Sequence, residues 1–283
     1  MEFSGQALHP EILQANVSYL SHDAFAEEIV GRSVRPRDLA RLTDFLAGGA
    51  WAYFGTTLEG ELDPIPILKP LQPRQDLQKG KPIKYETPWG RPATPWLPWI
   101  PEVARERISR RFGLSLTGNP WQTILENPEV PLFITEGPKK ALALLGMGAP
   151  AIALRGVTQW HPKRDNWPYE VLSRFAQKRQ IFIVFDQDDR LTTRRNVGQQ
   201  ACKLAQALLR CGAQKVRFLE WDGKKGKGID DFLGQLPSEN RWTTFTYLME
   251  SALSLERFKS KWVRTDNEYF LQRLQDLDNE YYI

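Results

Sequence analysis

The sequence predicts an α/β protein whose mostly parallel sheet is flanked by helices. From Val130 onward, short apolar runs such as "PLFIT" and "QIFIVF" alternate with segments whose apolar residues recur at helical spacing. This alternation is typical of a parallel sheet with helices on its faces. In addition, acidic residues and glycines follow several of the apolar runs, at the sheet edge where such folds bind ligands. A hydrophobic share of 41% with 25% charged residues is ordinary for a globular chain.

Residues 1–129 are predicted to form a helical and extended region that precedes the sheet. Residues 1 to about 55 favour helices, and Pro36 suits the first turn of a second helix. Residues 56–101 are dense in proline, which excludes long helices and favours extended segments. Residues 102–112 predict a short basic helix. The apolar positions at helical spacing are Ile12, Leu20, Phe25, Ile29, Leu39, Leu42, Phe45 and Leu46.

Residues 130–235 are predicted to form the α/β domain, and residues 236–283 a helical tail. Gly212 ends the longest predicted helix of the domain. The predicted strands are residues 131–135, 149–154, 180–185 and 215–221. The predicted helices are residues 138–147, 169–178, 197–212 and 228–233.

Positive charge is concentrated in the middle of the chain. Residues 131–235 carry 18 basic and 10 acidic side chains, whereas residues 1–130 carry 14 and 16 and residues 236–283 carry 6 and 8. A basic segment around a few acids predicts a polyanionic partner whose phosphates also meet a metal, although a solvated basic surface would give the same pattern. We therefore expect DNA, with single strands favoured, or RNA as the partner, and nucleotides as further candidates.

The remaining composition predicts a reduced, cytoplasmic protein that does not cross a membrane. No apolar run approaches the roughly 20 residues that span a bilayer, and the N-terminus lacks the pattern of a signal peptide. The chain has 2 cysteines, Cys202 and Cys211, without the Cys-x-x-Cys spacing of a zinc ribbon. We expect both to be reduced packing residues.

Acidic residues with glycines nearby mark three stretches: "ITEGPKKA" at 134–141, "VFDQDD" at 184–189 and "GKGIDDFL" at 226–233. Asp186 and Asp188 leave a strand end at a spacing from which both can reach one divalent cation, although capping and turn formation would also use them. We expect them to bind Mg²⁺, with Mn²⁺ as an alternative. Glu136 could act as general acid or base or join the metal shell.

Several other residues of these stretches are candidate ligands. Asp230 is the third metal candidate, with Asp231 left open as an alternative, and Asp189 is expected to cap or to face solvent. The candidates for phosphate contact are Gly137, Lys139, Lys140, Arg155, Lys225 and Lys227, with Lys139 preferred over Lys140. An ordinary surface role is the alternative for each of the lysines, and a surface ion pair for the arginine.

These three stretches, in this order, resemble the Toprim domain of bacterial primases, topoisomerases and some nucleases. The resemblance implies a small parallel α/β fold. It also implies a catalytic glutamate followed by glycine, matched by Glu136 and Gly137, and an Mg²⁺-binding Asp-x-Asp pair, matched by Asp186 and Asp188. In that family the glutamate is held to act as general acid or base in strand transfer or polymerisation.

A closer resemblance extends over residues from about 65 to 234. The order of "LKPLQPRQDLQKGKPIKYETP", "ITEGPKKALAL", "ALRGVTQW", "VFDQDD" and "GKGIDDFL" is similar to a poorly characterised Toprim-like family of plasmid and phage replication proteins, often fused to primase or helicase modules. A helicase or another replication protein is therefore an expected partner. Within this sequence there is no primase-type zinc module and no Walker A motif.

Taken together, the motifs and the resemblance predict Mg²⁺-dependent phosphoryl transfer on nucleic acid in the replication of a plasmid or phage, by a primase-related enzyme. Two alternatives remain open at this point. A Toprim-type nuclease would use the same acids with water as the attacking group, and a non-catalytic DNA-binding or assembly subunit would keep only the fold and the basic surface.

Overall fold

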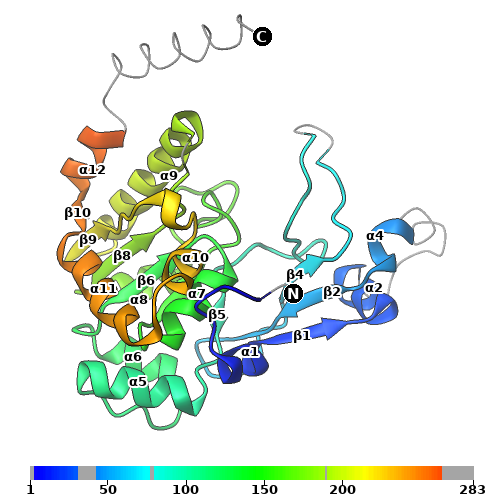
Figure 1. Ribbon diagram of the computed structural model, residues 1–283, viewed down its shortest axis with the longest axis horizontal. Helices are drawn as coiled ribbons and strands as arrows, with labels where there is room; N and C mark the ends of the chain where they lie inside the picture. The colour runs from blue at the N-terminus through cyan, green and yellow to red at the C-terminus, as the bar shows by residue number, and fades with distance from the viewer. Residues whose placement is uncertain (1–2, 31–42, 77–79, 189, 263–283) are drawn as a thin grey trace, which may run out of the picture.

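A computed structural model describes residues 3–30, 43–76, 80–188 and 190–262 of the chain (Figure 1). Five strands form the central sheet, in the order β10-β9-β8-β6-β7. β6, β7, β8 and β9 pair in parallel, whereas β10 joins the edge antiparallel to β9. The predicted fold class, a mostly parallel α/β sheet flanked by helices, is confirmed. The strand bounds are β6 Leu132–Thr135, β7 Ala151–Ala153, β8 Gln180–Val184, β9 Lys215–Phe218 and β10 Leu253–Ser254.

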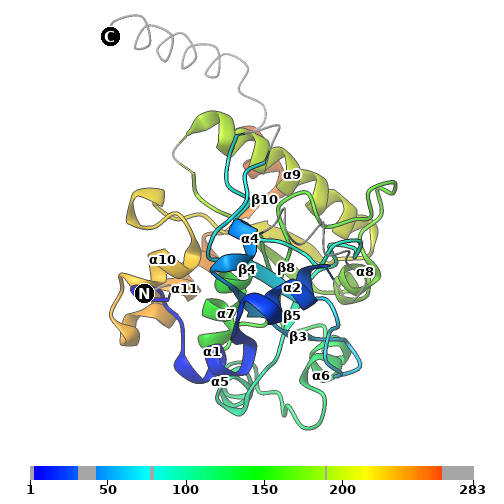
Figure 2. The ribbon, with the colours of Figure 1, turned by 90° about the vertical axis from the view of Figure 1, so that its right-hand side faces the viewer.

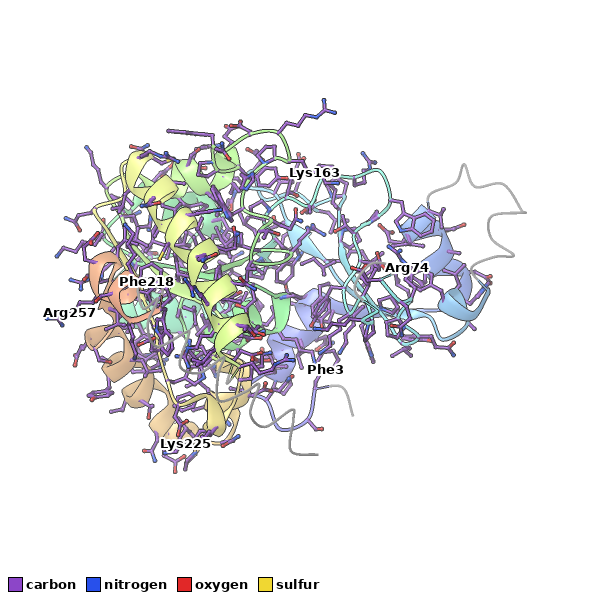
Figure 3. All side chains as sticks on the ribbon, turned by 90° about the horizontal axis from the view of Figure 1, so that it is seen from above. Phe3, Arg74, Lys163, Phe218, Lys225 and Arg257 are labelled. Atoms are coloured by element: carbon purple, nitrogen blue, oxygen red, sulfur yellow. The ribbon has the colours of Figure 1, made fainter. Side chains whose placement is uncertain are left out.

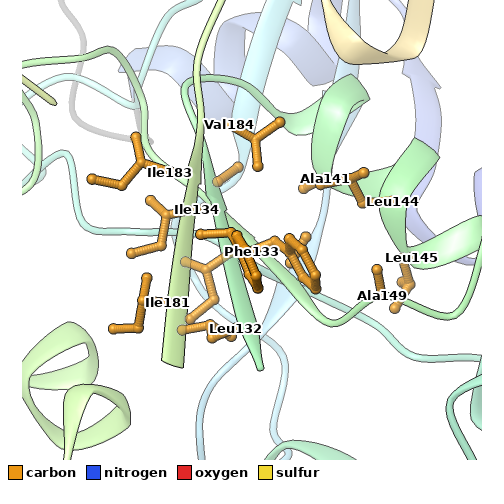
Figure 4. Close-up of a cluster of buried hydrophobic side chains, with 14 of the residues drawn as sticks. Leu132, Phe133, Ile134, Ala141, Leu144, Leu145, Ala149, Ile181, Ile183 and Val184 are labelled. Carbon is orange, nitrogen blue, oxygen red and sulfur yellow. The ribbon is translucent and has the colours of Figure 1, made fainter. Parts of the chain in front are cut away.

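Helices cover both faces of this sheet, with α8 and α9 on one side and α10 and α11 on the other (Figure 2). Because both faces are covered, the inner strands are continuous apolar runs rather than alternating ones. In β6, Phe133 points toward α7 while Ile134 points to the opposite face beside Ile181 and Ile183 of β8 (Figure 4). The helix bounds are α7 Pro138–Gly146, α8 Glu170–Ala176, α9 Leu191–Arg210, α10 Ile229–Gly234, α11 Ser238–Glu250 and α12 Leu255–Trp262, and a short 3₁₀ turn, η1, is Gly223–Lys225.

The N-terminal region contains an antiparallel sheet, which corrects the helical prediction for residues 1–55. β1 pairs with β2, and β2 pairs with β4. Five apolar positions of the helical pattern do lie in helices, Ile12 in α1, Phe25 and Ile29 in α2, and Phe45 and Leu46 in α4, whereas Leu20 lies in β1. Pro36, Leu39 and Leu42 fall outside the described residues. The bounds are α1 Pro10–Asn16, β1 Val17–Leu20, α2 His22–Val30, α4 Thr43–Ala47, β2 Ala50–Tyr53 and β4 Ile67–Pro70.

The proline-rich segment forms a cover between the two sheets. In its described residues it forms short strands and no helix, as the sequence predicts. Trp96 is fully buried and bridges to Ala153 of β7, which attaches the segment to the edge of the parallel sheet. The bounds of the remaining elements are β3 Gly55–Thr56, β5 Leu97–Pro98, α5 Glu102–Phe112 and α6 Pro120–Glu126.

The described part of the C-terminal region is mainly helical, as predicted, and it returns to the sheet. β10 is the exception, since Leu253 and Ser254 pair with β9 where a helix was expected. Phe245 of α11 is fully buried against Phe133 of β6. Residues 263–283 of the predicted tail lie outside the described residues. Cys202 and Cys211 are buried and free, as expected. No helix in the described ranges is long and apolar enough to cross a membrane.

Arg179 connects the end of α6 to the sheet by hydrogen bonds. The residue is fully buried just before β8, and its guanidinium donates to the carbonyls of Ile124 at 2.7 Å, Asn127 at 3.1 Å and Val130. The last carbonyls of a helix lack partners inside the helix, so a buried helix end needs an outside donor. Arg179 supplies that donor to the helix that precedes β6.

We expect Arg179→Met to lower the free energy of unfolding by about 3 kcal/mol or more, because several buried carbonyls lose their donor and each costs roughly 1–3 kcal/mol. Urea denaturation of the full chain measures this change. Arg174→Met, on the exposed side of α8, is the matched control and is expected to stay within about 0.5 kcal/mol of the wild type. Equal stability of the two variants would contradict the assignment.

Candidate active site

Two adjacent parallel strands bring Glu136 and Asp186 together. Thr135 of β6 pairs with Val184 of β8, so the residues that follow leave the sheet at the same carboxyl edge. Glu136 Oε1 accepts a hydrogen bond of 3.0 Å from the backbone N–H of Asp186. The two acids singled out in separate motifs therefore form one pair at this edge.

Lys140 places its ammonium between these acids. Its Nζ lies 3.2 Å from Glu136 Oε1 and 3.1 Å from Asp186 Oδ1, and its side chain is 17% exposed. Pro138 begins α7 directly after the strand, so Glu136 and Lys140 stand four residues apart across the first turn, where side chains meet. Of the two lysines, the sequence analysis preferred Lys139 as the ligand-facing one. The structure places Lys140 in the acidic cluster instead, and Lys139 lies 5.2 Å from the ring of Phe3.

The third motif reaches the same edge through Asp230. This residue is 3% exposed in the first turn of α10, and its Oδ1 has no hydrogen-bond partner among the described residues. A Cβ added at Gly228 would lie 2.4 Å from Asp230 Oδ1 and 2.9 Å from Lys140 Cε, so only glycine permits this approach. Asp231 instead accepts a hydrogen bond of 3.1 Å from Gln6. Asp230, rather than Asp231, therefore faces the cluster.

The Lys140 ammonium is shared by three acids, of which Asp230 is buried and Glu136 and Asp186 are partly buried, and the pKa values of the acids differ accordingly. Burial raises the pKa of Glu136 to about 8, against the opposing effect of Lys140. Burial also raises the pKa of Asp230, again opposed by Lys140. For Asp186, burial acts upward but Lys140 and the hydrogen bond with Glu136 hold the pKa below its usual range. Burial acts to lower the pKa of Lys140, yet the three acids raise it well above its ordinary value.

Asp188, expected to bind metal with Asp186 and Asp230, has its partners outside this cluster, and its role as a metal ligand remains a prediction. Its carboxylate is bonded to Lys227 Nζ at 2.5 Å and to the backbone N–H of Arg190 at 3.0 Å. Within the described residues, no three His, Cys, Asp or Glu side chains form a group that could hold a metal ion. Asp189 lies outside the described residues.

The remaining phosphate candidates divide into exposed and buried residues. Lys225 lies exposed in η1, and Lys227 is half-exposed in the same loop beside Asp188. Gly137 precedes α7 with an extended backbone, at the turn that presents Glu136. Lys225 and Lys227 are thus exposed at the rim, whereas Gly137 is buried, and the roles of all three as phosphate contacts remain predictions.

The prediction that Arg155 contacts phosphate is corrected, because its guanidinium is bonded inside the protein. Its side chain is 3% exposed and donates to the carbonyls of Thr94 at 2.8 Å and Pro66 at 2.7 Å, and also to that of Ile65. Arg155 therefore joins the end of β7 to the proline-rich cover and does not present its donors to a phosphate.

Sequence reasoning missed a polar hollow beside α9. The cavity has a volume of about 610 Å³, and no Asp or Glu is among the described residues that line it. In the view from above, Lys163, which lines the hollow, and Lys225, which does not, lie far apart (Figure 3). The basic surplus of the middle segment was visible in the sequence, but its assembly here was not, since the lining comes from a loop and a helix about 40 residues apart. The basic and amide side chains of the hollow are Gln159, His161, Lys163, Asn166, Gln200, Lys203, Gln206 and Arg210.

Residues 120–239 match the protein family DUF3854, which is described as a domain of unknown function. The matched range contains all three acidic motifs. The chain is also 30% identical over 265 residues to an uncharacterised protein of Picosynechococcus sp. (strain ATCC 27264 / PCC 7002 / PR-6). That alignment covers 81% of this chain and 25% of the relative, so the chain spans about a quarter of the length of the curated relative.

A similar arrangement of elements occurs in the crystal structure of the Aquifex aeolicus primase, which comprises its zinc-binding and RNA polymerase domains. The two structures superpose with a TM-score of 0.52 and 13% sequence identity, over 95% of this chain and 59% of the primase chain. At this identity the likeness establishes a primase-like fold.

We expect the stability of the wild type to fall relative to Glu136→Gln as the pH rises from about 5 to about 8, in EDTA. The pKa of Glu136 is higher in the folded protein than in the unfolded chain. Its contribution to stability is therefore complete at a pH below the unfolded pKa and is lost as the pH rises through the folded pKa. One pKa unit corresponds to about 1.4 kcal/mol, and sharing of charge within the cluster reduces the effect, so the expected loss is on the order of 2 kcal/mol.

Urea denaturation at several pH values measures this difference. Glu106→Gln on the exposed side of α5 is the matched control, and we expect its difference from the wild type to be independent of pH within about 0.5 kcal/mol. A wild type that gains stability relative to Glu136→Gln over this pH range would contradict the raised pKa.

Proposed function

We propose that this chain is the catalytic core of a primase-related enzyme that carries out Mg²⁺-dependent phosphoryl transfer on nucleic acid during DNA replication. The observation that carries the proposal is the cluster of Glu136, Asp186 and Lys140 at the carboxyl edge of β6 and β8. Ligands of parallel α/β sheets bind at this edge. Paired acids with a shifted pKa in such a place are typical of catalytic sites.

The cluster has carboxylate oxygens to spare for a cation. Glu136 Oε2 and Asp230 Oδ1 are buried and have no hydrogen-bond partner among the described residues. Unpaired oxygens of this kind suit Mg²⁺, which uses one or two protein carboxylates and completes its shell with water and phosphate oxygens. Asp186 and Asp230 are the residues that would hold it. When bound, the ion would orient the phosphate and neutralise its developing charge.

Glu136 is the residue proposed to move the proton. Its raised pKa, about 8, leaves the carboxyl able to exchange a proton near neutral pH, as a general acid or base requires. Lys140 keeps Asp186 ionised and positions Glu136 through their shared contacts. Gly137, Lys139, Lys225 and Lys227 are proposed to contact phosphates around this rim.

Single-stranded nucleic acid is the proposed substrate partner, with nucleotides as the second reactant. The hollow beside α9 supports this choice, since lysine and arginine side chains attract phosphates while amide groups suit base edges. The primase-like fold supports the same reaction class. Assignment to the Toprim-like family of plasmid and phage replication proteins, and a helicase or another replication protein as partner, also belong to this proposal.

Primer synthesis by the full chain tests the proposal most directly. On a single-stranded template with labelled nucleotides and Mg²⁺, Asp186→Asn and Glu136→Gln are each expected to reduce the rate at least about 100-fold, because each removes a charge or proton carrier from the site. Glu106→Gln, the exposed control, is expected to keep the wild-type rate.

The same assay separates the alternatives. Template degradation that is lost in Asp186→Asn, without synthesis, would replace the proposal by a nuclease. Strand binding without turnover, unchanged by Asp186→Asn, would contradict catalysis and favour a DNA-binding or assembly subunit.

A further inference from the structure

A second charged cavity lies at the opposite end of α7 from the acidic cluster. It has a volume of about 350 Å³ and is walled by the N-terminal segment, α5, the last turn of α7 and the start of α11. Its polar lining residues are His9, Arg107, Arg111, Ser238 and Arg241, with Trp242 beside them. The tail helix, whose role the sequence did not reveal, thus contributes a wall of this cavity.

Basic side chains dominate the polar lining of the cavity. No Asp or Glu is among the described residues that line it. Burial and, after it, the like charges of Arg107 and Arg110 together lower the pKa of Arg111 to about 10. Like charges in a partly buried space are unfavourable unless an anion joins them.

The guanidinium groups are held in place by backbone carbonyls. Arg107 donates to Gly146 and Arg111 to Met147, at the end of α7, while Arg241 Nε donates to Leu236 at 3.1 Å. Arg111 also stacks over the ring of Trp242 at 3.4 Å. Each guanidinium has five N–H donors, so these contacts fix its position and leave further donors for a ligand.

His9 provides an independent sign of a missing partner. Its Nδ1 is buried and has no hydrogen-bond partner in the described structure, although it lines the same cavity. Buried polar atoms are nearly always hydrogen-bonded, so an unpaired one beside three arginines points to an acceptor or donor that completes the site.

We infer that this cavity binds a terminal phosphate group, carried either by a free nucleotide or by the end of a nucleic-acid strand. Arginine forks match the oxygens of phosphate, and a space of about 350 Å³ fits a small group better than a continuous strand. The inference does not rest on the proposed catalysis, because the cavity shares no lining residue with the acidic cluster.

Calorimetric titration of inorganic pyrophosphate into the full chain tests this inference, in EDTA so that metal-dependent binding at the acidic cluster does not contribute. Ser238→Asp places a negative charge in the cavity while leaving the three arginines intact, and it is expected to weaken binding at least tenfold. Arg241→Gln is expected to weaken it in the same direction.

Two exposed neighbours outside the cavity lining are the matched controls. Asn240→Asp adds the same negative charge as Ser238→Asp, on the same turn of α11 but outside the lining. Arg110→Gln removes one positive charge, as Arg241→Gln does, from an exposed position on α5. Both are expected to stay within twofold of the wild type. Absence of pyrophosphate binding to the wild type, or equal loss in Asn240→Asp and Ser238→Asp, would overturn the inference.

A second titration identifies the source of the phosphate. A nucleoside triphosphate that binds more tightly than an oligonucleotide would assign the cavity to free nucleotides. Preference for a 5′-phosphorylated oligonucleotide over its 5′-hydroxyl form would assign it to strand ends. Loss of binding in Lys227→Gln would place the ligand at the acidic cluster and overturn the inference.

Discussion

The ammonium of Lys140 is the interaction on which the rim of the sheet depends. Its Nζ lies 3.2 Å from Glu136 Oε1 and 3.1 Å from Asp186 Oδ1. It also interacts electrostatically with Asp230, for which it is a counter-charge. Three wholly or partly buried acids that share this ammonium cannot all be ionised at low cost, because charge buried without a partner is expensive. Such a cluster favours the uptake of a further proton, and the proposed cation would supply the remaining counter-charge.

Buried arginines hold the surroundings of that cluster in place. Arg179 joins the end of α6 to the start of β8, and Arg155 joins the end of β7 to the proline-rich cover. Both guanidinium groups donate hydrogen bonds to backbone carbonyls of these segments. Three arginines around the cavity at the far end of α7 use the same contact, but they gather on one space and retain donors toward it. Arginine thus connects segments of the fold at two positions and lines a charged cavity at three others.

The sequence predicted most of the parallel sheet because its signals are local. The runs at 131–135 and 180–185 contain β6 and β8, and the helix predicted at 138–147 contains α7. Three short strands were missed for a physical reason. β1, β2 and β10 have 4, 4 and 2 residues, too few for their own periodicity to be distinguished, and the strands that they pair with lie at least 14 residues away along the chain. Tertiary pairing decides such segments rather than local propensity.

The candidate site was predictable in its acids but not in their partners. Glu136, Asp186 and Asp230 follow from strand ends and motif order, and the structure brings them to one edge. Lys140 carried a readable signal, four residues after Glu136 on one helical face. Arg155 carried none, since its carbonyl partners lie 61, 89 and 90 residues away along the chain. A basic side chain near a strand end can serve a ligand or the fold, and only its neighbours distinguish the two.

Binding of Mn²⁺, followed by electron paramagnetic resonance in the presence of a single-stranded oligonucleotide, tests the central claim most directly. Mn²⁺ prefers the same oxygen ligands as Mg²⁺ and reports its own coordination. The account expects the wild type and Glu106→Gln to bind the ion, and Asp186→Asn to lose it, because that carboxylate is the ionised member of the cluster. Binding of equal strength in Asp186→Asn, or no binding to the wild type, would contradict the claim that the edge of β6 and β8 is a phosphoryl-transfer site.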